Sequence, residues 1–135
     1  MPVADTELLF LLNPNDPRYK YAIKIIEEYR GNIYVPDVAL FEFEIVLRSR
    51  GVSVEDIKTA FKALRKIFST FNIKELKCID TALIINHLDL MNEYGLSFFD
   101  SLIASAALSF DGIIVSDDSD FDRVGFLRRI PITYS

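Results

Sequence analysis

Acidic residues occur in this sequence at positions where apolar residues are expected. Glu42 is the clearest case, because its neighbours on one face of a helix are all apolar: Val38, Ala39, Ile45 and Val46. An isolated carboxylate in such a stripe is costly, so it must be protonated, paired or bound to a cation. The simpler interpretation is a residue at the rim of the helix that reaches water.

Other segments place acids in comparable positions. Asp100 has apolar helical neighbours, although it could also complete a capping box that begins at Ser97. Asp5 and Asp118 each follow a short apolar run typical of a buried strand, and Asp120 comes two residues later. Each of these could also cap a helix, so no single acid decides the matter.

Taken together, the acids indicate a cation site. Carboxylates from four separate segments would repel one another strongly without cations. Oxygen ligands select hard ions such as Mg²⁺ or Mn²⁺, which suit phosphodiester hydrolysis. The acidic run 116–122 is not an EF-hand loop, because Arg123 and Arg129 stand where Gly and Glu are required. It is not an aspartyl-phosphate motif either, because little chain follows it.

Helical and strand patterns alternate along the chain that must position these acids. Apolar spacing and capping residues predict helices over 6–12, 17–30, 36–50, 53–70, 80–94 and 97–110. Short β-rich runs predict strands at 2–4, 33–35, 113–115 and 130–133, and 71–79 reads as extended or irregular. The alternation predicts one α/β domain over residues 1–135, with a short, mostly parallel sheet covered by helices. Ligands bind such sheets beyond the carboxyl ends of the strands, where Asp5 and Asp118 lie.

Composition narrows the classes of protein. The chain has 135 residues, with 15 basic and 20 acidic side chains and a net charge of −5, which argues against a non-specific nucleic-acid binder. The single cysteine, Cys78, excludes a disulfide framework and a zinc site built on several thiolates, and the single histidine, His87, excludes a His-rich metal cage. His87 has apolar helical neighbours and is expected in the core or at its rim. With no signal-like start and no long apolar run, we expect a cytoplasmic protein.

The acidic segments, in their order along the chain, resemble the PIN domain, the metal-dependent nuclease fold of VapC-type toxins. Residues 3–6 are similar to its opening strand and first acid, and 39–48 to its second acidic motif. Residues 94–104 closely resemble the third, and 116–121 the fourth, with Ser116 in place of the commoner threonine. The resemblance covers nearly the whole chain and implies a three-layer α/β/α sandwich.

The resemblance also implies a set of functional residues. The catalytic and metal-binding acids would be Asp5, Glu42, Asp100 and Asp118, with Asp120 as a fifth metal ligand. Thr6 and Ser116 would orient carboxylates or water through hydrogen bonds. Arg48, Arg50 and Arg123 are the candidate contacts to RNA phosphates.

What the resemblance implies about function is specific. The chain would be a Mg²⁺- or Mn²⁺-dependent endoribonuclease that cleaves single-stranded or looped RNA, tRNA among its targets, and leaves a 5′-phosphate and a 3′-hydroxyl. It would form a homodimer and be neutralised by a small antitoxin, which we expect on the helices that carry 19–26 and 57–68. The alternative is a PIN-like fold that has lost activity and serves as a protein-interaction scaffold.

Overall fold

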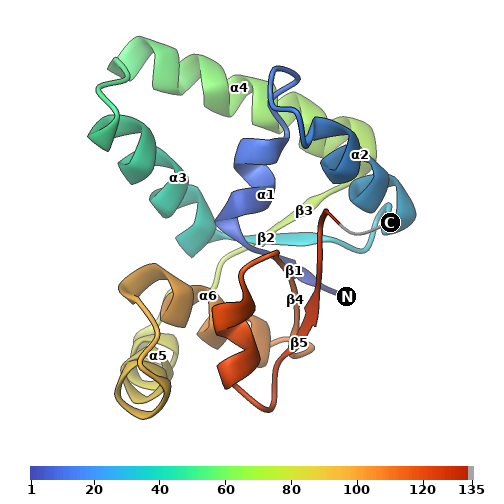
Figure 1. Cartoon of the computed structure of the whole chain (residues 1–135). Coiled ribbons are helices and arrows are strands. Elements are labelled where there is room, and N and C mark those ends of the chain that lie inside the picture. The colour runs from blue at the N-terminus through green and yellow to red at the C-terminus, as the bar shows by residue number, and fades with distance from the viewer. Residues whose placement is uncertain (134–135) are drawn as a thin grey trace.

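The computed structural model describes residues 1–133, which fold as a five-stranded parallel sheet between two layers of helices (Figure 1). The strand order is β3-β2-β1-β4-β5, and all four neighbouring pairs are parallel. The strands are β1 (Val3–Ala4), β2 (Tyr34–Pro36), β3 (Lys74–Leu76), β4 (Ile113–Val115) and β5 (Arg128–Ile130). The predicted α/β sandwich is confirmed.

Two groups of helices cover the two faces of the sheet. The connections from β1 to β2 and from β2 to β3 run through α1 (Thr6–Leu11), α2 (Tyr19–Glu28), α3 (Asp37–Ser49) and α4 (Val54–Phe71). The connection from β3 to β4 runs through α5 (Thr81–Tyr94) and α6 (Phe98–Leu108), on the opposite face (Figure 1). The winding of the chain therefore reverses between β1 and β4, and the carboxyl ends of these two strands form the topological switch point.

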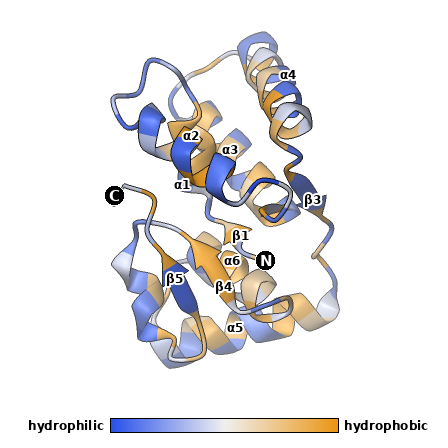
Figure 2. Cartoon of the chain, turned by 90° about the vertical axis from the view of Figure 1, so that its right-hand side faces the viewer, coloured by the Kyte–Doolittle hydropathy of each residue, from blue (hydrophilic) through white to orange (hydrophobic). Residues whose placement is uncertain are grey.

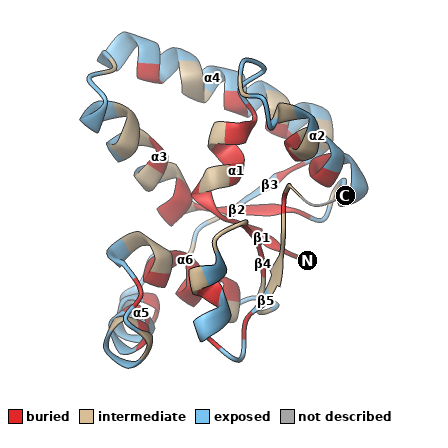
Figure 3. Ribbon diagram, in the orientation of Figure 1, coloured by how far each residue is buried: buried red, intermediate tan, exposed pale blue. Residues whose placement is uncertain are grey.

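The core lies around the central strands and α6. Val3, Ile114 and Val115 are fully buried, as is α6 from Ser101 to Ala107 (Figure 3). Helix α6 is enclosed because it packs against the sheet on one side and against α5 on the other. Phe121 is fully buried as well. It anchors the short 3₁₀ helix η1 (Ser119–Arg123) and thereby the acidic loop that follows β4.

Most predicted helix starts are confirmed, because capping depends on residues close in sequence. The side chains of Ser53, Asp80 and Ser97 accept backbone N–H bonds at the starts of α4, α5 and α6. The helix predicted over 17–30 starts later than expected, because Asp16, a possible N-cap before Pro17, does not cap it. The Asp16 carboxylate accepts the N–H of Arg18 at 2.8 Å in a tight turn, and the helix begins only at Tyr19.

The two edge strands differ from expectation. The segment read as extended or irregular contains the strand β3, and the last strand is Arg128–Ile130 rather than 130–133. Both strands pair on one side only, so their side chains are polar and partly exposed, as the blue colour of β3 and of much of β5 in Figure 2 shows. An apolar pattern is therefore weak in both. Among the described residues, no helix is both long and apolar enough to cross a membrane.

Candidate active site

Asp5 is fixed at the carboxyl end of β1, where it is also the N-cap of α1. Its Oδ1 accepts the N–H of Thr6 at 2.8 Å, and its Oδ2 accepts the hydroxyl of Ser116 at 2.6 Å. The Ser116 oxygen in turn accepts the N–H of Asp118 at 3.0 Å. These hydrogen bonds cap α1 and also hold the Asp5 carboxylate in position, and they join the carboxyl ends of β1 and β4.

The environment of Asp5 shows that several carboxylates meet here. Burial raises the pKa of Asp5 from 3.8 to about 7, against the opposing effect of the Ser116 hydroxyl. The charges of Asp100, Glu42 and Glu7 contribute to this rise. Acids from α1, α3, α6 and the end of β1 therefore interact directly through space.

Glu42 lies at the rim of the core and faces these acids. Burial raises its pKa, the nearby Thr6 hydroxyl opposes this effect, and the charge of Asp100 adds to it. The expectation that all its helical neighbours belong to the core is wrong, because Ile45 is 51% exposed while Val38 and Ala39 are buried. Glu42 is therefore near both the core and solvent, on the side of α3 that faces α6.

Asp100, Asp118 and Asp120 form a compact group. One carboxylate oxygen of each lies within 4.8 Å of the others. Asp118 caps η1 by accepting the N–H of Asp120 at 2.9 Å, and Asp120 forms an ion pair with Arg123 at 3.1 Å. Burial raises the pKa of Asp100, and the charges of the other two acids add to the effect.

An open cavity of about 330 Å³ joins most of these groups. It is lined by Asp5, Thr6, Glu7, Phe10, Arg18, Glu42, Val46, Arg50, Asp100 and Asp118. Within residues 1–133, the buried Thr6 hydroxyl has no hydrogen-bond partner. The possible metal ligands in this cavity are therefore carboxylate and hydroxyl oxygens, and such a set fits a hard divalent cation such as Mg²⁺ or Mn²⁺.

The three candidate phosphate contacts differ in position. Arg50 lines the cavity, with its guanidinium carbon 5.0 Å from the centre of the Phe10 ring. Arg48 instead forms a surface ion pair with Glu44, at 2.7 Å, and does not line the cavity. Arg123 is next to the acids through its ion pair with Asp120.

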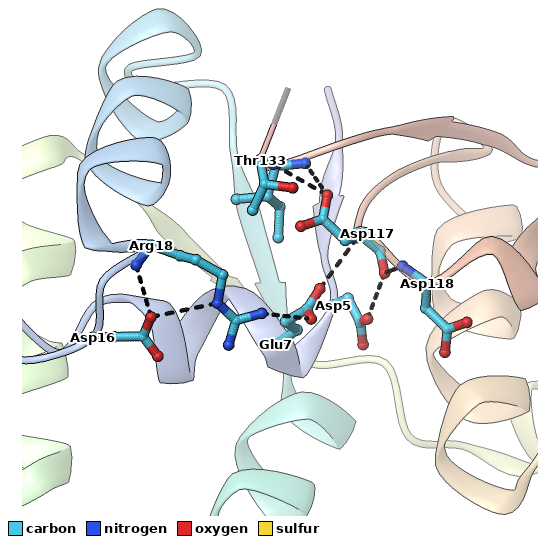
Figure 4. Close-up of polar contacts among 9 residues, drawn as sticks. Asp5, Glu7, Asp16, Arg18, Asp117, Asp118 and Thr133 are labelled. Atoms are coloured by element: carbon cyan, nitrogen blue, oxygen red, sulfur yellow. Dashed lines mark hydrogen bonds and ion pairs between the residues drawn. The ribbon is translucent and has the colours of Figure 1, made fainter. Parts of the chain in front are cut away.

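Sequence reasoning missed a second polar group at the same edge, shown in Figure 4. Glu7 accepts the N–H of Asp117 at 3.2 Å, and Arg18 lies 3.7 Å from its carboxylate. Asp117 accepts the N–H groups of Ile132 and Thr133, which ties the end of the described chain to the acidic loop. Glu7 could have been found as an acid two residues after Asp5, whereas nothing local pointed to Arg18.

The remaining titratable candidates lie outside the cavity. His87 is buried as expected, with Nδ1 2.8 Å from the hydroxyl oxygen of Ser101. Burial raises the pKa of the Cys78 thiol to about 11, so this thiol is a poor nucleophile. The chemistry of the site is therefore that of carboxylates.

A parallel α/β sandwich with carboxylates gathered at its switch point defines the class of protein. The PIN domain family model matches residues 3–127, so the chain belongs to the PIN domain family, whose members are typically nucleases. A search of curated proteins found no significant match.

Solved structures share the fold at low sequence identity. VapBC2 from Rickettsia felis, bound to a promoter DNA fragment, has a TM-score of 0.72 and 17% identity, over 96% of each chain. VapBC from Salmonella typhimurium, bound to DNA, has a TM-score of 0.67 and 15% identity, over 97% of this chain and 98% of that one. PAE2754 from Pyrobaculum aerophilum has a TM-score of 0.63 and 24% identity, over 96% of this chain and 89% of that one.

Proposed function

We propose that this chain is a metal-dependent endoribonuclease and the toxin of a VapBC-type toxin–antitoxin pair. The observation that carries the proposal is the meeting of Asp5, Glu42, Asp100 and Asp118 around one cavity that also contains the unpaired Thr6 hydroxyl. Membership of a family of typical nucleases supports it, as do the similar structures that are toxin–antitoxin complexes.

The acids around the cavity would hold one or two Mg²⁺ or Mn²⁺ ions, with Asp120 as a further ligand. Such an ion supplies Lewis-acid stabilisation of the phosphate and makes water a better nucleophile near neutral pH. Ser116 holds the Asp5 carboxylate in place through its 2.6 Å hydrogen bond, and the Thr6 hydroxyl is free to orient a water molecule. Water would attack the phosphorus atom, and the 3′ oxygen would leave and take up a proton, giving a 5′-phosphate and a 3′-hydroxyl.

The proposed substrate is single-stranded or looped RNA, with tRNA as one candidate. The net charge of −5 repels RNA at long range. Bound cations and Arg50 would nevertheless make the potential inside the cavity favourable for a phosphate group. We place the protein in the cytoplasm, together with its RNA substrate.

The test is cleavage of labelled single-stranded RNA and of total tRNA with Mg²⁺ or Mn²⁺, against a chelated control. We expect cleavage by the wild-type protein and loss of it in Asp100→Asn, with 5′-phosphorylated products. The matched control is Asp89→Asn, an exposed acid of α5, which should cleave as the wild type does. Absence of metal-dependent cleavage would instead favour the inactive scaffold.

A small antitoxin is the proposed protein partner. An apolar cavity of about 510 Å³ lies between α1, α3 and α4 and shares Phe10 and Arg50 with the acidic cavity. An apolar helix of the antitoxin could occupy this groove, while an Arg or Lys side chain of the same partner binds the carboxylates of the acidic cavity in place of a cation. Of the two helices expected at the antitoxin interface, α4 lines this groove and α2 does not.

We also propose that the toxin is a homodimer. Helix α5 exposes Ile84, Ile85 and Leu88, and the neighbouring Phe98 is 56% exposed. Apolar side chains on consecutive turns of one helix are typical of a surface that another chain covers. Sedimentation of the wild type against Leu88→Lys tests this: the wild type should have the mass of two chains and the variant that of one.

A further inference from the structure

The acidic cavity has a cationic residue whose position is set by two carboxylates. Asp16 accepts both the backbone N–H of Arg18, at 2.8 Å, and its Nε, at 3.4 Å. The Nη1 atom of Arg18 lies 3.7 Å from a carboxylate oxygen of Glu7 (Figure 4). The guanidinium is therefore held at the cavity wall from two sides.

This arrangement leaves Arg18 able to bind a further anion. A guanidinium has five N–H donors, of which Asp16 takes one, and the contact to Glu7 is longer than a hydrogen bond. The side chain is 48% exposed, so the remaining donors are accessible. Because the side chain is already ordered, binding an anion would cost little rotamer entropy.

The electrostatics place Arg18 beside the proposed metal ligands rather than among them. Burial raises the pKa of Glu7, and Arg18 partly offsets that effect. The raised pKa values of Asp5, Glu42 and Asp100 come chiefly from burial, and the charges of other carboxylates add to the effect. The guanidinium thus lines the same cavity, and Glu7 is the acid of that cavity within ion-pair distance of it.

We propose that Arg18 binds the backbone phosphate next to the one that is cleaved, and so sets the path of the RNA strand across the site. The proposal rests on the proposed nuclease function. The predicted phosphate contacts Arg48 and Arg123 do not line this cavity, and their carboxylate partners are closer than those of Arg18, at 2.7 and 3.1 Å. Arg18 has its guanidinium anchored at the cavity with donors to spare, and Arg50 supplies positive charge elsewhere on the same wall.

The experiment measures binding of a fluorescein-labelled 12-nucleotide single-stranded RNA by fluorescence anisotropy in Ca²⁺, over a range of KCl concentrations. Arg18→Ala should raise Kd roughly tenfold. It should also reduce the slope of log K against log salt by about 0.7, as expected for one lost phosphate contact on a single strand. Arg18→Lys keeps the charge but loses the planar fork, so it should weaken binding less and keep the wild-type slope.

Arg30→Ala is the matched control, because Arg30 is likewise exposed and paired with a carboxylate, that of Glu27 at 3.5 Å, and does not line the cavity, so its Kd should change less than twofold. Melting temperatures of all variants separate loss of binding from loss of fold. In cleavage assays with Mg²⁺, Arg18→Ala should raise KM more than it lowers kcat, because the contact is to a neighbouring phosphate.

The outcomes distinguish this proposal from the nuclease function. Wild-type cleavage with unchanged Kd, KM and salt slope in a folded Arg18→Ala variant would overturn the role of Arg18 alone. Wild-type RNA binding without cleavage, weakened in Arg18→Ala, would support the phosphate contact and overturn the nuclease function. If the wild type neither binds nor cleaves RNA, both proposals are wrong.

Discussion

Replacing Asp5 by asparagine should change how stability depends on pH. In the folded protein, burial raises the pKa of Asp5 to about 7, whereas the unfolded value is 3.8. The folded state therefore holds this proton more tightly than the unfolded state does. The resulting stability is complete below the unfolded pKa and is lost as the pH rises through about 7.

The magnitude follows from the two pKa values. Their difference corresponds to about 4 kcal/mol in the free energy of unfolding once Asp5 is fully ionised. Between pH 5 and pH 8 the wild type should lose roughly 2 to 3 kcal/mol of this. The asparagine side chain cannot ionise and keeps an acceptor for the N–H of Thr6, so only the bond to Ser116 is altered, at a cost of about 1 kcal/mol.

The assay is urea denaturation at pH 5 and pH 8 in the presence of a chelator, so that no bound cation offsets the destabilising effect of the ionised Asp5 carboxylate. Asp5→Asn should lose much less stability than the wild type across this range and should be the more stable protein at pH 8. Asp89→Asn, an acid-to-amide change on the exposed side of α5, should follow the wild type. Parallel pH dependence in the wild type and Asp5→Asn would refute the reasoning.

Three further predictions test the site and its support. Millimolar Mg²⁺ or Mn²⁺ should raise the melting temperature of the wild type through linkage, and calorimetry that shows no shift would contradict the cation site. Glu42→Gln should abolish RNA cleavage and leave the melting temperature equal or higher, because a repelling carboxylate is gone. Glu44→Gln should leave cleavage unchanged, because the pair with Arg48 is exposed and contributes at most about 1 kcal/mol. Phe121→Ala should lower the free energy of unfolding by about 3–5 kcal/mol in urea titrations, because it empties a fully buried site beneath the Asp118 loop.

Local signals in the sequence were sufficient for the helices and for the acids that follow the central strands. The caps at Ser53, Asp80 and Ser97 each accept the N–H of the residue three positions later, so they can be recognised from nearby residues in the sequence. The strands β1 and β4 are buried on both faces, which requires short continuous apolar runs. The edge strands β3 and β5 are partly exposed and contain polar residues, so no continuous apolar run marks them in the sequence.

The tertiary structure decided which of these groups meet. The bond between Ser116 and Asp5 joins residues 111 positions apart, and the contact between Arg18 and Glu7 depends on how the turn before α2 folds back over α1. The surroundings of Glu42 were also decided there, because packing against α1, α4, α6 and β2 determines which side of α3 is buried. Capping and apolar periodicity act over a few residues, whereas burial and charge interactions depend on distances in space that only the folded chain defines.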